Sequence, residues 1–165
     1  MVLTREELIS SLQNEVRILL HLASKIDRDK LDYRPSPKQR SIIELLRYMS
    51  YMAPSLIPSI KSGTFDMTVW QAAQAKAAAS DFDALLVTIG EQSQGCAALL
   101  GEYSDADFRG EIDMFGRKNS RGSHLVNLVL SAFAAYRMQL FLYLKACGRE
   151  ELNTMNLWGG VDGSM

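Results

Sequence analysis

The sequence contains few of the residues that build reactive or cross-linked sites, with only two cysteines and two histidines among 165 residues. Cys96 and Cys147 both fall in stretches with helical patterning, so we predict two buried thiols and a reducing, cytoplasmic setting, not a secreted disulfide framework. The formal net charge of −1 leaves no excess of positive charge for a nucleic-acid backbone. The first residues do not combine a basic start with an apolar run, and we therefore expect no export signal.

Strand-type alternation, internal repeats, a glycine-rich phosphate loop and a Ser/His/Asp arrangement are also missing. The hydrophobic content of 47% is nevertheless enough to bury one core at this chain length. We expect a single domain over residues 1–165. Within it, residues 149–165 are expected to form an extended C-terminal tail, with Leu157 and Trp158 available to dock on the domain.

Two capping boxes mark helix starts, because a serine or threonine and a glutamate three residues later can each bond the other's backbone N–H. They pair Thr4 with Glu7 and Ser41 with Glu44. The first helix should end near Lys25. The second contains Pro54 and Pro58, which we expect to kink or end it.

The middle of the chain predicts one short and one long helix. An alanine-rich segment, 68–79, favours the short helix because alanine loses little entropy in a helix. Asp81 can cap the long one, which should stop near Tyr103. Residues 104–122 are polar and contain glycine, and we expect a short hairpin or an extended strap there.

A last long helix should begin at Ser120 or Ser123 and end at Gly148 as a left-handed cap. Residues 125–144 are long and apolar enough to span a membrane, but they include polar groups that are costly in lipid: Asn127, Arg137 and Gln139. The segment is apolar on nearly all sides, so we interpret it as a buried central helix. Four long helices with modest loops predict an all-α, up-down bundle with a longer crossover and a short extra helix.

Two segments resemble the DinB/YfiT superfamily. LDYRPSPKQRSIIELLRYMSYM (31–52) is similar to the entrance of that family's second helix, and AAYRMQLFLYLKACG (134–148) is similar to its last-helix signature. The resemblance implies a DinB-like four-helix bundle from about Leu31 to Gly148. It also implies pairing of two bundles through helix faces, and hence a homodimer.

In that family three histidines bind a divalent metal, and the resemblance places those positions at Tyr48, Ala132 and Tyr136. Alanine offers no ligand atom, and tyrosine must lose a proton with a pKa of about 10 before it coordinates well. We therefore predict a degenerate site with no metal and no cofactor. An alternative site would need both His21 and His124 with nearby carboxylates, and structural roles for these histidines are the better interpretation.

The residues at the family's metal positions suggest a cleft for a small apolar ligand, since tyrosine combines an apolar ring with one orienting hydroxyl. The predicted lining is Tyr48, Tyr51, Ala132, Tyr136 and Gln139. In the alternative, Tyr48 and Tyr136 fill the volume of the missing metal and hydrogen-bond to each other or to Gln139. Arg137 should meet a carboxylate such as Glu44 or reach the surface, which we favour over an anion-binding role.

These observations leave two hypotheses for function. The first is a DinB-like protein without the family's metal chemistry, which binds a small molecule or acts through dimerisation and has neither nucleic acid nor membrane as a partner. The second follows from the resemblance: a thiol-dependent transferase, an isomerase or a metal-dependent hydrolase that uses unusual ligands. The missing histidines favour the first, non-enzymatic hypothesis.

Overall fold

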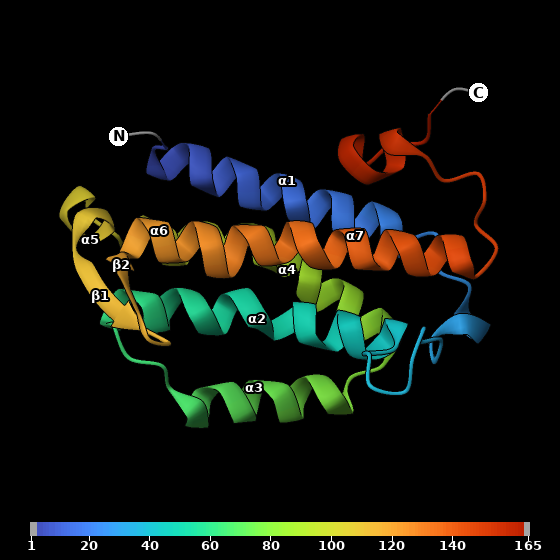
Figure 1. Ribbon diagram of the computed structural model, residues 1–165, viewed down its shortest axis with the longest axis horizontal. Helices are drawn as coiled ribbons and strands as arrows, with labels where there is room; N and C mark the ends of the chain where they lie inside the picture. Colours follow the sequence, from blue (N-terminus) through green and yellow to red (C-terminus); the bar gives the residue numbers. More distant parts are fainter. Residues whose placement is uncertain (1–2, 164–165) are drawn as a thin grey trace.

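The computed structural model describes residues 3–163 and shows a bundle of long helices (Figure 1). Its members are α1 (Arg5–Ala23), α2 (Ile42–Ser62), α4 (Phe82–Gly101) and a last helix that runs through α6 (Arg121–Leu125), the π-helical turn η2 (Val126–Leu130) and α7 (Ser131–Ala146). α1 and α2 each pack against both α4 and α7, so α4 and α7 occupy opposite corners of the bundle.

The crossover between α2 and α4 contains an extra helix, α3 (Met67–Ala79), which packs on the outside of α2. α2 and α4 run in the same direction, opposite to α1 and α7, because α3 carries the chain back along the bundle between them (Figure 1). A short 3₁₀ turn, η1 (Arg28–Lys30), lies in the connection from α1 to α2. The expected all-α bundle, with its longer crossover and short extra helix, is confirmed.

Both predicted capping boxes start helices as expected. The Thr4 backbone N–H donates to Glu7 at 2.7 Å, and the Ser41 N–H donates to Glu44 at 2.8 Å. The two prolines do not end α2, which continues to Ser62. Pro54 and Pro58 are four residues apart and lie toward the outside, while the buried Ala53 and Ile57 hold the helix in the core. Tertiary packing therefore outweighs the lost backbone hydrogen bonds.

Residues 104–122 form a short helix, α5 (Asp105–Arg109), and an antiparallel hairpin of β1 (Glu111–Met114) and β2 (Arg117–Ser120). The expected hairpin is therefore present and the extended strap is not. Its turn residues, Phe115 and Gly116, have φ of 54° and 75°. Positive φ at both central positions is typical of a type I′ turn.

The last helix is not central, contrary to our expectation. It is long and apolar enough to cross a membrane by length and composition, yet only 28% of its most apolar 18-residue window is buried. A bundle corner gives each helix only one inward side, so Phe133 and Leu140 face the core while Met138 and Leu142 are exposed. Gly148 has φ of 100° and ends the helix as predicted.

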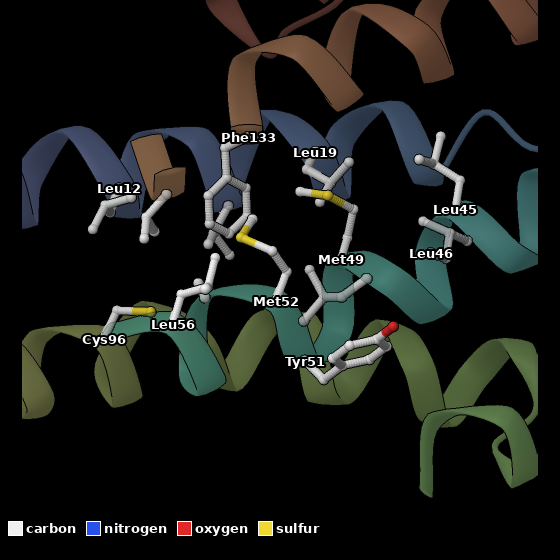
Figure 2. Packing of buried hydrophobic residues seen from close by; sticks show 14 of the residues in the cluster. Leu12, Leu19, Leu45, Leu46, Met49, Tyr51, Met52, Leu56, Cys96 and Phe133 are labelled. Atoms are coloured by element: carbon white, nitrogen blue, oxygen red, sulfur yellow. The ribbon is translucent and has the colours of Figure 1, made fainter. Parts of the chain in front are cut away.

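The core lies between the four long helices (Figure 2). Leu19 of α1 lies beside Met49 of α2, Phe133 reaches in from α7 beside Met52, and Leu12 lies farther along α1. Figure 2 also shows Tyr51 on the other side of α2, with its hydroxyl pointing away from these residues. Of the two thiols expected to be buried, Cys96 is buried, whereas Cys147 is only half-buried because it follows the end of α7.

The C-terminal segment differs from the extended tail that we predicted, since Met155–Gly159 forms a π-helical turn, η3. Asn153 and Asn156 start it: the Met155 N–H donates to the Asn153 side chain at 2.8 Å, and the Asn153 N–H donates to the Asn156 side chain at 2.9 Å. Such local bonds favour turns over extended chain. Leu157 is buried against the bundle as expected, but Trp158 remains 65% exposed.

Candidate ligand-binding site

A cavity of about 350 Å³ lies between the first half of α2 and the second half of α3. Its wall combines two guanidinium groups, two phenols, one carboxylate and one amide. The lining residues are Arg40, Glu44, Arg47, Tyr48, Tyr51, Gln74 and Ala78. The volume falls at the lower end of the range usual for small-molecule sites, roughly 300–1,000 Å³.

Tyr48 is the centre of an aromatic cluster that joins three helices. Its ring centroid lies 5.0 Å from that of Tyr136 on α7, 5.7 Å from that of Tyr51 and 6.1 Å from that of Trp70 on α3. Tyr51 and Trp70 are also 5.0 Å apart. All four contacts have edge-to-face geometry, which aromatic pairs prefer. The cluster therefore fixes the apolar wall of the cavity.

The two arginines of the cavity have no carboxylate partner within residues 3–163. The Arg40 guanidinium carbon lies 4.1 Å from the Tyr48 ring centroid and 5.8 Å from that of Tyr136, within cation–π range. Arg47 Nε is buried, and no described residue accepts its hydrogen. A buried, unpaired donor in a cavity wall is a strong sign of an external partner.

Glu44 does not neutralise either arginine, because its carboxylate is already engaged. It accepts from the Ser41 N–H at 2.8 Å and from Arg34 Nη2 at 3.0 Å. These hydrogen bonds, led by that of the Ser41 backbone, hold the pKa of Glu44 below its usual range. Arg137 meets a carboxylate, as expected, but the partner is Glu15 on α1 at 2.8 Å and not Glu44, the example given above.

The phenols of the cavity are neutral over the physiological range. Burial, followed by the neighbouring Tyr136, raises the pKa of Tyr48 to about 12. Burial also raises the pKa of Tyr51. Both residues therefore present an O–H group that can donate or accept a hydrogen bond.

The rings of Tyr48, Tyr51 and Tyr136 lie in one cluster, but of these three predicted lining residues only Tyr48 and Tyr51 line the cavity. Ala132, one turn before Tyr136 on α7, does not line the cavity. Gln139 does not bond to the central tyrosines either. Its side chain donates to the Tyr143 hydroxyl at 2.5 Å, and that hydroxyl donates to the Arg40 carbonyl at 3.0 Å. Gln139 therefore supports the backbone next to the cavity instead of touching a ligand.

Sequence reasoning missed both cavity arginines, along with Trp70 and Gln74. A signal for Arg47 was present, because it lies three residues after Glu44 and four before Tyr51, and such spacings place side chains on one face of a helix. Arg40 precedes α2 and gave no such signal. Trp70 and Gln74 gave no such signal. They come from α3, whose docking on α2 is a tertiary feature.

The residues at the family's metal positions do not fit a divalent cation. Tyr48 offers a phenol that its raised pKa keeps neutral, Tyr136 offers a second phenol, and Ala132 offers no donor. In residues 3–163, no three His, Cys, Asp or Glu side chains are grouped closely enough to hold a metal ion. His21 ends α1 beside Asn156, whereas His124 is buried in α6 near the opposite end of the bundle (Figure 1), so the two cannot share a site.

These features define a helical bundle with an aromatic, arginine-lined cavity, and its fold is DinB-like. No family model matches the chain, and no curated protein does. Among solved structures it is similar to the crystal structure of a DinB-like protein, YjoA, from Bacillus subtilis, with a TM-score of 0.68 and 23% sequence identity. The match covers 88% of this chain and 94% of the other.

Proposed function

We propose that this DinB-like bundle works without a metal, carries out no hydrolase or transferase chemistry, and binds a small organic molecule in the cavity beside Tyr48. The observation that supports this most strongly is the residue set at Tyr48, Ala132 and Tyr136. With a pKa of about 12 for Tyr48, roughly one molecule in 10⁵ carries the phenolate at pH 7. Such a site would not compete for zinc or nickel against ordinary imidazole sites.

The lining of the cavity supports the binding of a small organic molecule. Tyr48 and Tyr51 offer apolar ring surface with two neutral hydroxyls, and Gln74 adds an amide from α3. Ring faces provide contact area for an organic ligand, and the polar groups beside them can fix its orientation. We infer that the ligand places its apolar part against the two rings, between α2 and α3.

The outer face of α7 supports a homodimer. Between Gly122 and Leu144 the only side chains of Lys, Arg, Asp, Glu or His type are His124 and Arg137, and both are at most 4% exposed. The exposed face therefore presents uncharged residues, including Met138 and Leu142. An uncharged apolar strip on a protein with 22% charged residues is typical of an interface. We propose that it packs on a second copy in the cytoplasm, and not on a membrane or nucleic acid.

A metal titration tests the first part of the proposal. Native protein and the variant Tyr48→His/Ala132→His/Tyr136→His are titrated with zinc and nickel by calorimetry, and circular dichroism confirms that both are folded. We expect no stoichiometric binding by the native protein and stoichiometric binding by the variant. Stoichiometric zinc binding by the native protein would favour the enzymatic alternative. A folded variant that binds no metal would show that these three positions are not equivalent to the family's histidines.

A fluorescence assay tests the second part. The chain has two tryptophans, Trp70 beside the cavity and the exposed Trp158. In a Trp158→Phe background, emission reports on Trp70 alone. Small aromatic compounds that occupy the cavity should shift this emission saturably, and the shift should disappear when Ala78→Phe fills the cavity. A set of such compounds without any saturable effect contradicts small-molecule binding at this site.

A further inference from the structure

We infer that the ligand of the cavity is an organic monoanion, with a carboxylate held by Arg47 and Arg40 and an aromatic or other apolar body held against Tyr48 and Tyr51. This inference rests on the proposed small-molecule binding and adds the chemical class of the ligand. It differs from the sequence-based expectation of a purely apolar molecule. The difference arises from the two arginines, which the tyrosine pattern alone did not reveal.

Arg47 points to an anion because one of the hydrogen-bond donors of its guanidinium has no acceptor. It is on α2 one residue before Tyr48, and its Nε–H is buried with no acceptor among residues 3–163. An unsatisfied charged donor in a half-buried position is costly, and a carboxylate oxygen would remove that cost. A guanidinium also matches a carboxylate geometrically, since both groups are planar and can form two parallel hydrogen bonds.

Arg40 supplies a second, preoriented cation at the same opening. Its guanidinium lies over the Tyr48 ring at 4.1 Å, and its carbonyl is fixed by the Tyr143 hydroxyl at 3.0 Å. A guanidinium held over a ring can still donate hydrogen bonds from its N–H groups, which point outward in its own plane. An anion in the cavity would therefore meet two positively charged groups that pair with no carboxylate of residues 3–163.

Glu44 limits the charge of the ligand. Its carboxylate lines the same cavity, and its low pKa keeps it ionised. Its charge is paired with that of Arg34 at 3.0 Å, so Arg40 and Arg47 both remain available to the carboxylate of the ligand. A dianion such as a phosphate monoester would add repulsion against Glu44. The volume of about 350 Å³ leaves room for a ring beside the carboxylate.

The test compares probes of equal shape and different charge on the full-length Trp158→Phe protein. Phenylacetate is the carboxylate, phenylacetamide its neutral counterpart and phenyl phosphate the dianion. Dissociation constants come from calorimetry, and Trp70 emission locates the binding. We expect phenylacetate to bind about tenfold or more tightly than phenylacetamide, the gain usual for a charge-assisted hydrogen-bond pair. Phenyl phosphate should bind more weakly than phenylacetate.

Arginine variants then assign the preference to the cavity. Arg47→Met and Arg40→Met keep the apolar stem and remove the charge, and each should reduce the preference for phenylacetate while leaving phenylacetamide binding nearly unchanged. The matched control is Arg117→Met on β2, an exposed arginine outside the cavity. It should leave both affinities unchanged. Melting curves show whether each variant is folded.

Three outcomes would overturn the inference. Equal affinity for phenylacetate and phenylacetamide would show that the cavity binds small molecules without recognising a carboxylate. Tighter binding of phenyl phosphate than of phenylacetate would show that the cavity prefers a dianion to a monoanion. A carboxylate preference that survives both Arg40→Met and Arg47→Met would place the anion elsewhere. None of these readouts depends on metal, so failure here is distinct from stoichiometric zinc binding, which would overturn the proposed function itself.

Discussion

The buried pair of Arg137 and Glu15 gives a sharp test of how the bundle is held together. Arg137 brings a charge into an otherwise apolar helix, where its side chain is 4% exposed and that of Glu15 is 12% exposed. Its Nε lies 2.8 Å from Glu15 Oε2, and Nη2 donates to Oε1 at 3.2 Å. Nη1 donates to the Leu157 carbonyl, and the Trp158 ring covers the guanidinium at 5.1 Å. One side chain thus joins α7, α1 and the C-terminal turn.

The variant Arg137→Met should destabilise the protein strongly. Methionine fills a similar volume but leaves the Glu15 carboxylate buried without its partner. Breaking one side of a buried ion pair costs about 3–5 kcal/mol. For a chain of this size that corresponds to a fall in Tm on the order of 10 °C. The double variant Glu15→Met/Arg137→Met removes both charges, and should recover most of the loss.

The pH dependence provides a second readout. Burial raises the pKa of Glu15, although Arg137 opposes the shift; without the arginine the pKa should rise further. A carboxyl with a raised folded-state pKa stabilises the fold at low pH, and this stabilisation is lost as pH rises through that pKa. The difference in free energy of unfolding between the native protein and Arg137→Met should therefore become smaller as pH falls from 7 toward about 4.3.

Urea unfolding followed by circular dichroism at pH 7 and at pH 5 measures both effects, with Arg117→Met as the surface control. The reasoning is refuted if Arg137→Met costs less than about 1 kcal/mol, the level of an exposed pair. It is also refuted if the double variant is no more stable than the single one, because the loss would then come from packing and not from an isolated charge.

Three further predictions concern the turn, the tyrosine cluster and the outer face of α7. Phe115→Asn should raise the free energy of unfolding by about 0.5–1 kcal/mol, because asparagine tolerates the positive φ of 54° better than phenylalanine. Destabilisation in urea would show that the edge-to-face contact of Phe115 with Phe65, 5.3 Å between ring centroids, matters more. With a Tyr48 pKa of about 12, the free energy of unfolding of the native protein should fall as pH rises from about 10 to 12, and Tyr48→Phe should reduce this fall. Identical pH profiles of stability for the two proteins would contradict the raised pKa. Met138→Glu/Leu142→Glu should elute later than native protein on gel filtration while keeping its helical spectrum, and a native protein that is monomeric at every concentration contradicts the dimer.

The bundle could be predicted because its signals are local. Capping boxes at Thr4 and Ser41 fix helix starts through contacts within four residues, and the left-handed Gly148 fixes an end in the same way. The continuation of α2 past Pro58 could not be predicted, because it depends on packing around Ala53 and Ile57. The hydrophobicity of the last helix was misleading for a related reason, since composition does not show which side faces a neighbour.

The candidate site was predictable only in part. Tyr48 and Tyr136 could be grouped because the resemblance placed both at the family's metal positions, and Tyr51 lies three residues after Tyr48 on the same helix. Arg47 was overlooked since nothing in its local sequence shows that its Nε is buried without an acceptor. Charge alone could suggest a carboxylate such as Glu44 as the partner of Arg137, whereas the pairing of α1 with α7 selects Glu15. Such choices are made by three-dimensional neighbours many residues apart.

The metal content of the native protein tests the central claim most directly. The chain is purified from cells without chelator or affinity metal, and zinc, nickel, iron and manganese are measured per chain by mass spectrometry. The residues at 48, 132 and 136 predict substoichiometric amounts of every metal, unchanged after dialysis against EDTA. A stoichiometric metal that EDTA removes, and that is lost in Tyr48→Phe/Tyr136→Phe, would contradict the claim that this bundle has dispensed with metal chemistry.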